Sequence, residues 1–525
     1  MLPLLQRGAQ PVAVLQHRDD RAATAASRGE GAARAFRGDP AGGLRAARRA
    51  DRGVAGGARG VVRRDPEGRR RTGPLRTGRA VNRTLGLPQA TALILGTIIG
   101  VGIFNLPYSL AGIGPISILA MVLTTVGALA LAVMFAALSR RLPADGGPYA
   151  YARAAFGNTV GFVNAWSYWI TAWAGNAAIV TGWVFYVEHF VNKDGKTLWS
   201  IVIALVGLWI PALINLTGVK NMGAVQLWTT VIKFIPLVNM STAGLFFIST
   251  ANYHPANLTG GGDGKAIGSA MAICLFSYLG VECAAVAAAK VRDPAKNVPK
   301  ATVLGTLGAA VVYLLSMIAV FGIVPAGTLA DDKASYSAAA NLMAGGGTWA
   351  GDLTALAVIV SGFGALNGWT MICAEMPLAA ARDGVFPALF GRLSKRGVPA
   401  AGILSSTILG SLAMTVSYMG ASGATVFNTL VLMTGITAAI PYAFSALAQL
   451  RWRVRGRLTR DAVIAVLALI FAILFVWYSR NTGQDHWYVV WGPFLMAGAA
   501  FLLGVPVYLA VRRHMTAPPP VPAHE

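Results

Sequence analysis

The sequence predicts an all-α integral membrane protein with twelve transmembrane helices. Its 525 residues are 55% hydrophobic and only 12% charged, which is not the composition of a soluble protein. From residue 88 onward, twelve apolar segments are long enough to cross a bilayer as helices. Basic residues gather in every second connection between these segments, as expected for a multi-pass membrane protein.

The twelve segments follow one another with short connections. Their approximate bounds are 88–111, 115–139, 153–188, 198–217, 223–249, 266–289, 301–325, 350–381, 400–420, 425–449, 461–479 and 488–511. The third and the eighth exceed the length that a bilayer requires, so we expect each to be tilted or to extend beyond the membrane.

The charges of the connections predict the orientation. With the N-terminus placed in the cytoplasm, the inner connections, their margins and the C-terminal end carry 19 Lys and Arg residues, against five on the outer side. This positive-inside asymmetry predicts that both termini are cytoplasmic and that the protein lies in the plasma membrane, which in a bacterium is the cytoplasmic membrane. Much of the formal net charge of +23 therefore reflects these connections and gives no reason to expect nucleic-acid binding.

Residues 1–83 form an N-terminal tail that differs from the rest of the chain. They contain 19 Arg, no Lys and seven acidic residues, with few apolar side chains and no periodicity. Such a segment cannot bury enough surface to fold. A disordered tail or an over-long start of the reading frame, a nucleic-acid or lipid-binding arm, and a targeting peptide all remain open. We predict one membrane domain at 84–515 and a short disordered tail at 516–525.

The first apolar segment is interrupted in its middle. The stretch GTIIGVGIFNLP at 96–107 places Gly100 and Gly102 at mid-depth. Non-helical backbone is tolerated there only inside protein or beside a water-filled cavity. The amides at the start of a half-helix suit an anion such as a carboxylate. Close helix packing by small residues is the alternative interpretation.

The sixth segment has a matching interruption. AMAICLFSYLGVECAAVAAA at 270–289 places Ser277 and Gly280 in mid-span, with Glu282 directly after them. Interruptions in positions one and six indicate two five-helix inverted repeats, at about 88–249 and 266–449, with a binding site at the midplane. Two additional helices at 461–511 complete the domain.

Three charged residues lie in the interior of the apolar segments, away from their ends. Glu282 is our first candidate for proton coupling or pH sensing, because ionisable groups in the membrane are costly and usually functional. Lys233 could supply a positive charge that ties the fifth helix to the break in the first. Glu375 lies in the long eighth segment. For each residue a structural role remains open, and for Glu375 so does cavity lining.

The sequence gives no reason to expect a metal, a cofactor or an enzymatic activity. Cys274, Cys283 and Cys373 lie inside apolar segments, without a CxxC pair or a nearby His. HExxH, GxSxG, a P-loop and paired catalytic carboxylates are not found, which also argues against ATP-driven transport.

Five stretches resemble one known group of transporters in order and spacing. They are GTIIGVGIFNLP (96–107), GGPYAYARAAFG (146–157), YWITAWAGN (168–176), LGVECAAVAAAKVRDPAKNVPKAT (279–302) and LNGWTMICAEMPLAAARDGVFP (366–387). From about 84 to 512 the chain resembles the amino acid–polyamine–organocation superfamily, and within it the basic amino acid/polyamine antiporters, especially their arginine/agmatine type. The resemblance implies the leucine-transporter fold, alternating access and a possible homodimer.

The resemblance also implies roles for individual residues. It assigns the backbone of Gly100, Val101 and Gly102 to the substrate carboxylate and the backbone around Ser277 and Leu279 to its ammonium group. Trp369 would stack on a cationic side chain and Asn176 would reach it. Further residues implied by the resemblance are Phe276 at an outer gate, Tyr168, Glu282 and Tyr442 at a cytoplasmic gate, and, more loosely, Thr434 at the distal pocket.

Some positions depart from the arginine/agmatine pattern. Val101 replaces a small hydroxyl residue, Phe276 replaces a gate Trp, and Thr171 and Ala172 differ from the usual pocket pair. Lys233 resembles the Lys that stands in for a sodium ion in proton-coupled relatives. These departures bear on the substrate and the coupling mode more than on the fold.

The sequence therefore predicts a secondary amino acid transporter, most simply an exchanger for basic amino acids or their decarboxylated amines. A proton-coupled permease for neutral amino acids is the alternative favoured by Lys233 and Val101. A membrane sensor that binds an amino acid without moving it is an alternative of another class. The expected partners are the small-molecule substrate, protons and the lipid bilayer.

Overall fold

The computed structural model describes residues 85–519, except 287, 420, 453–458 and 481–486. Within these residues the regular structure is helical, and one isolated parallel bridge joins Leu85 to Val291. The N-terminal tail at 1–83 lies outside the described residues. The fold class predicted from the sequence, an all-α membrane protein, is confirmed for the part of the chain that is described.

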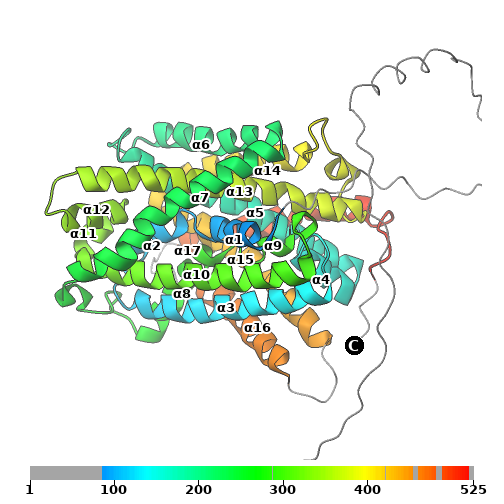
Figure 1. The fold of residues 1–525 in the computed structure, drawn as a ribbon, viewed down its shortest axis with the longest axis horizontal. Coiled ribbons are helices and arrows are strands. Elements are labelled where there is room, and N and C mark those ends of the chain that lie inside the picture. Colours follow the sequence, from blue (N-terminus) through cyan, green and yellow to red (C-terminus); the bar gives the residue numbers. More distant parts are fainter. Residues whose placement is uncertain (1–84, 287, 420, 453–458, 481–486, 520–525) are drawn as a thin grey trace, which may run out of the picture. The chain divides into compact units, whose positions relative to one another are not determined.

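The helices are numbered along the chain in Figure 1. Their bounds are α1 Leu87–Ile98, α2 Gly102–Leu110, α3 Ser117–Arg141, α4 Pro148–Phe156, α5 Asn158–Glu188, α6 Thr197–Thr217, α7 Val219–Thr242, α8 Asp263–Cys274, α9 Cys283–Val286, α10 Pro294–Ile323, α11 Ala326–Asp331, α12 Ser335–Met343, α13 Trp349–Arg382, α14 Ala400–Tyr418, α15 Gly423–Arg451, α16 Arg460–Tyr478, α17 Trp487–Leu502 and α18 Gly504–Val511. Short 3₁₀ helices add η1 Ala243–Phe247, η2 Thr250–Tyr253, η3 Leu275–Tyr278, η4 Ala288–Lys290 and η5 Ala388–Gly391.

Ten of the twelve predicted spans are helices long and apolar enough to cross a membrane within the described residues. The two that do not meet this criterion are 223–249 and 266–289. In the first, the apolar stretch Val231–Phe247 runs from α7 into η1 and is shorter than a membrane span requires. The second is divided into α8, η3 and α9, so no single helix in it has the required length.

The two long segments are long helices in the structure. α5 has 31 residues and α13 has 34, which agrees with the length expected from the sequence. Together with α15 they are the most deeply buried of the long helices outside the first span. α5 packs against both α13 and α15, and the interrupted helices contact this group, α1 at α13 and α8 at α15.

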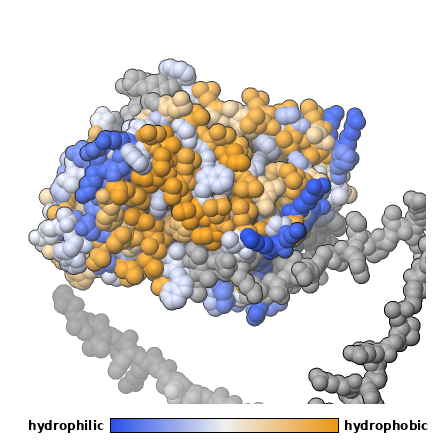
Figure 2. All heavy atoms as spheres, turned by 90° about the horizontal axis from the view of Figure 1, so that it is seen from above, coloured by the Kyte–Doolittle hydropathy of each residue, from blue (hydrophilic) through white to orange (hydrophobic). Residues whose placement is uncertain are grey.

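The outer helices expose large apolar side chains, most of all on α6, α7, α14 and α16. Figure 2 shows that such side chains cover the middle of one face, while hydrophilic residues gather at its two ends. Exposing these apolar side chains to water would cost free energy, whereas lipid tails are themselves apolar. Helices can lie in lipid because they satisfy their own backbone hydrogen bonds. The apolar band supports an integral multi-pass membrane protein.

A polar cluster joins α4 to the end of α13 and to residues 516–519, which the sequence analysis placed in the C-terminal tail. The buried guanidinium of Arg153 lies 2.8 Å from Oδ2 of Asp383 and donates to the carbonyl of Thr516 at 2.9 Å. The phenol of Tyr149 donates to the same carboxylate at 2.8 Å. Burial and the charge of Asp383 raise the pKa of Tyr149, so its hydroxyl stays a donor.

Candidate functional site

The first interruption separates α1 from α2 at residues 99–101. Ile99 is extended, with ψ 93°, and α2 begins at Gly102. A helix leaves its last carbonyls without partners within the helix, and in a buried position they need donors from elsewhere. The break predicted from Gly100 and Gly102 is therefore present. Its free-energy cost depends on whether neighbouring groups donate hydrogen bonds to the freed carbonyls.

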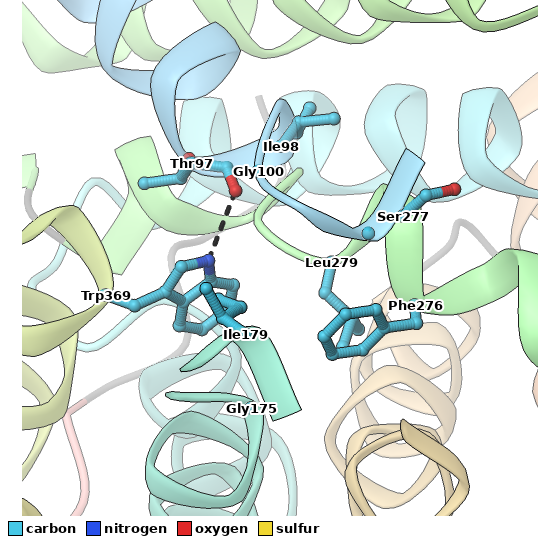
Figure 3. A pocket seen from close by; sticks show the side chains of 10 residues that line it. Thr97, Ile98, Gly100, Gly175, Ile179, Phe276, Ser277, Leu279 and Trp369 are labelled. Atoms are coloured by element: carbon cyan, nitrogen blue, oxygen red, sulfur yellow. Dashed lines mark hydrogen bonds between the residues drawn. The ribbon is translucent and has the colours of Figure 1, made fainter. Parts of the chain in front are cut away.

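Side chains from three other helices supply those donors. Lys233 of α7 donates from Nζ to the carbonyls of both Gly96 and Ile99, at 2.8 Å each. Trp369 of α13 donates from Nε1 to the carbonyl of Thr97 at 3.1 Å, as drawn in Figure 3.

Tyr313 of α10 donates to the carbonyl of Ile98 at 2.8 Å. Four successive carbonyls are thus satisfied by one ammonium, one indole and one phenol. A positive charge at a helix C-terminus also interacts favourably with the helix dipole.

Lys233 is fully buried, and its contact with the break is the one that the sequence led us to expect.

The second interruption lies beside the first. α8 ends at Cys274, η3 follows, Leu279 is extended with ψ 137°, and Gly280 has φ +109° before α9 begins. A Cβ atom on Gly280 would lie 3.1 Å from Oγ1 of Thr97, and one on Gly102 would lie 3.1 Å from the ring of Phe276. The absence of a Cβ at both positions allows the two breaks to contact each other.

A pocket lies where the two breaks meet. Its lining residues are Thr97, Ile98, Gly100, Gly102, Gly175, Ile179, Phe276, Ser277, Leu279 and Trp369. The enclosed space among them is about 20 Å³, which is room for about one water molecule. In Figure 3 the rings of Trp369 and Phe276 lie on opposite sides of this space. None of these ten side chains is charged, so the pocket offers backbone groups, one serine hydroxyl, one threonine hydroxyl and two aromatic rings.

Six predicted site residues line this pocket together. They are Gly100, Gly102, Phe276, Ser277, Leu279 and Trp369. The sequence analysis missed Thr97, Ile98, Gly175 and Ile179. Thr97 and Ile98 directly precede the first break. Gly175 and Ile179 lie one helical turn apart, on either side of Asn176. Their positions next to predicted residues could therefore have indicated all four.

The other three predicted pocket residues lie around it and not in its lining. The side chain of Val101 is fully buried and faces α13, where its Cγ2 is 3.4 Å from an ideal Cβ on Gly362. Thr434 contacts Gly175 through its methyl group, and its hydroxyl donates to the carbonyl of Leu430 at 2.6 Å. The side chain at 101 therefore does not face the pocket, so the loss of a hydroxyl there does not change the lining.

Asn176 has an unusual environment. Its Nδ2 lies 3.4 Å from Oγ1 of Thr370 and 3.7 Å from Sγ of Cys373, both on α13. Its Oδ1 is buried and has no hydrogen-bond partner among the described residues. A buried acceptor without a donor costs about 1–3 kcal/mol, so this oxygen is available to a donor that is absent from the structure.

Glu282 is held by two tyrosines, as the resemblance implied. Tyr168 donates to Oε1 at 2.7 Å and Tyr442 donates to Oε2 at 2.8 Å, and the three side chains come from the second break, α5 and α15. All three are buried, and the ring of Phe135 packs edge-on against Tyr442. A carboxylate can accept both bonds, whereas a protonated carboxyl group must turn one oxygen into a donor.

Glu375 forms a separate ion pair. Its Oε1 lies 2.6 Å from Nζ of Lys290, and the two side chains are 19% and 18% exposed. Both line a second, smaller pocket with Asn215, Met371 and Pro399. The alternative that Glu375 lines a cavity thus agrees with its position. Its partner was not foreseen, because Lys290 was counted only among the basic residues of an inner connection.

Comparison with known proteins places this architecture in a family. The family model described as "Amino acid permease" matches residues 85–514, which is most of the chain. The chain belongs to the amino acid permease family. This membership confirms the resemblance drawn from the five motifs, and it confirms that the chain is a transporter and not an enzyme.

Individual members of the amino acid permease family are similar over most of their length. The cadaverine/lysine antiporter of Escherichia coli K12 is 28% identical over 74% of this chain and 88% of its own. The arginine/ornithine antiporter of Pseudomonas aeruginosa PAO1 is 30% identical over 82% and 93%. A putrescine transporter of Haemophilus influenzae is 31% identical over 70% and 84%.

Proposed function

We propose that this permease exchanges basic amino acids and their decarboxylated amines across the plasma membrane by alternating access. The observation that carries the proposal is the meeting of two helix interruptions around a pocket that contains Trp369. The names of the relatives support the substrate class, since they describe antiport of lysine with cadaverine and of arginine with ornithine.

The substrate is proposed to bind with its carboxylate at the start of α2. The first amides of that helix, around Gly100, Val101 and Gly102, carry partial positive charge and lie at the pocket. Its α-ammonium group is proposed to lie at the carbonyls of η3 and Leu279, where the second helix is interrupted.

The cationic end of the substrate is proposed to lie between Trp369 and Asn176. The indole provides a cation–π surface, which contributes about 0.5–2 kcal/mol. The unpartnered Oδ1 of Asn176 provides an acceptor for an ammonium or guanidinium N–H. We expect Thr434, next to Gly175, to limit the length of side chain that fits.

Phe276 and the cluster of Tyr168, Glu282 and Tyr442 are proposed as the two gates. Phe276 contacts Phe427, with ring centroids 6.0 Å apart, and would close over the substrate on the outer side. On the other side, uptake of a proton by Glu282 would remove its charge and so weaken both tyrosine bonds. This change would loosen the gate and couple it to pH.

Twelve transmembrane helices in the leucine-transporter arrangement are proposed as the complete fold. α7 is counted as the fifth span, and α8, η3 and α9 are counted as the sixth. We place both termini in the cytoplasm, because the loops at that end carry most of the basic residues. A homodimer is proposed from the family resemblance alone.

Counter-flow in proteoliposomes tests the proposed function. We expect radiolabelled lysine or arginine to enter only when a cationic amino acid or diamine is enclosed in the vesicles. Uptake into empty vesicles that is driven by a pH gradient and competed best by leucine would instead identify a proton-coupled permease, with Lys233 as its first residue to mutate. Saturable binding without counter-flow would identify a sensor.

A further inference from the structure

The central pocket lacks a counter-charge for a cationic side chain. None of its ten lining residues is acidic, and Glu282 is fully buried with two phenols on its oxygens. Glu375 lies on α13, the helix that carries Trp369. Six residues separate the two positions, which is about 9 Å along a helix.

The carboxylate of Glu375 already binds an ammonium group. Nζ of Lys290 is 2.6 Å from its Oε1 and 3.7 Å from Sδ of Met371. The ammonium of a lysine side chain is the same chemical group as the terminal ammonium of free lysine or of a diamine. The Lys290 ammonium therefore shows how a substrate ammonium group could bind to Glu375.

This pair is exchangeable in a way that the Glu282 cluster is not. Its side chains are 18% and 19% exposed and line a pocket, whereas Glu282 is fully buried. Because the pair has partial access to water and lines a pocket, a free cation can reach the carboxylate and compete with the tethered ammonium. Lys290 ends η4, the short segment after the second break, so its ammonium is held at this carboxylate by a flexible side chain.

We propose that Glu375 is a second cation-binding site, at which the terminal ammonium or guanidinium of a substrate displaces the ammonium of Lys290. The inference rests on the proposed exchange of cationic substrates. The site lies between Trp369 and the C-terminal end of α13 at Arg382. We assign that end of the helix, with its basic loops, to the cytoplasmic side. A substrate would occupy it when entering from, or leaving to, that side.

The alternative is a simple latch, in which the pair only holds η4 against α13. The two roles predict different results for the two partners. A latch is lost equally when either charge is removed. A cation site is lost when Glu375 is neutralised. When Lys290 is neutralised, the site binds a free cation more readily, because the Lys290 ammonium no longer competes for Glu375.

The test uses the full-length protein in proteoliposomes of known orientation, with radiolabelled lysine on one side and cadaverine on the other. KM is measured separately for lysine at each face. For E375Q we expect the cytoplasmic-face KM to rise about tenfold, a loss of about 1.4 kcal/mol, while the KM at the outer face stays the same. For K290M we expect the cytoplasmic-face KM to fall.

Glu188→Gln is the matched control. Glu188 also forms a pair with a lysine, 3.5 Å from Nζ of Lys333, but at the C-terminal end of α5, outside the pocket at Glu375. We expect this variant to leave the cytoplasmic-face KM unchanged. The KM at the outer face in the same vesicles shows that each variant is folded.

Each outcome decides the question. A rise in the cytoplasmic-face KM for E375Q without a rise for K290M supports the site. Equal changes in both variants, or no change in E375Q, overturn it and leave the exchanger in place. A parent protein that exchanges no cationic substrate overturns the proposed function, and the second site with it.

Discussion

The replacement of Lys233 by Met tests how the break in the first helix is held. In the structure one ammonium donates to two carbonyls, those of Gly96 and Ile99, in fully buried surroundings. Methionine keeps the length of the side chain and removes both donors. Each buried acceptor left without a partner costs about 1–3 kcal/mol, which gives about 2–6 kcal/mol for the two.

Part of this cost is recovered. The buried ammonium has itself lost its hydration, a penalty of several kcal/mol that disappears with the charge. We therefore expect Lys233→Met to reduce the free energy of unfolding by about 2–4 kcal/mol, the lower part of the range for two orphaned acceptors. Because Thr97 and Gly100 line the pocket, the same change should also weaken substrate binding.

Thermal unfolding of the purified protein in detergent measures the effect, with two graded controls. Tyr313→Phe removes the donor to Ile98, and Trp369→Phe removes the donor to Thr97, so each leaves a single acceptor unpaired. We expect the Tm of the Lys233 variant to be the lowest of the three. A Tm at or above that of Tyr313→Phe would refute the idea that the ammonium supports the break.

Three further predictions concern the pocket and its gates. Trp369→Ala should weaken binding of a guanidinium ligand by about 0.5–2 kcal/mol, as measured by ligand-binding calorimetry; an unchanged Kd would remove this ring from the site. Glu282→Gln should flatten the pH profile of exchange, because an amide cannot take up the proton; a profile that overlays the parent would place the coupling elsewhere. Gly280→Ala should lower the Tm and slow exchange, since φ +109° costs a non-glycine residue about 1–3 kcal/mol and its Cβ would press on Thr97. A Gly264→Ala variant, whose Cβ meets open space, is the control for that last change, and equal effects of the two would contradict it.

The interruptions could be predicted from the sequence because their cause is local. Glycines in the middle of an apolar segment lower the cost of non-helical backbone, and this signal is visible at Gly100, Gly102 and Gly280 without any knowledge of tertiary structure. The lengths of α5 and α13 were visible for the same reason, since an apolar run longer than a bilayer has few other interpretations.

The partners of the freed carbonyls could not be predicted in the same way. The sequence indicated that Lys233 contacts the first break, but not that it donates to Gly96 and Ile99 and leaves Thr97 to an indole from α13. Which donor meets which carbonyl depends on the relative rotation of three helices. The pair of Lys290 and Glu375 was missed because 85 positions separate them and each alone has an ordinary interpretation as a loop or wall residue.

The hydrogen bond between Trp369 and Thr97 links binding to gating. The indole that is proposed to receive the cationic side chain also satisfies a carbonyl at the end of α1. If the ring turns toward a substrate and this bond breaks, the loss is about 1–3 kcal/mol, because a buried acceptor is left without a donor. The cation–π contact returns about 0.5–2 kcal/mol. Because the two amounts are similar, substrate can shift the ring between two positions without fixing it in either, which is what an exchanger needs in order to release its substrate on the other side.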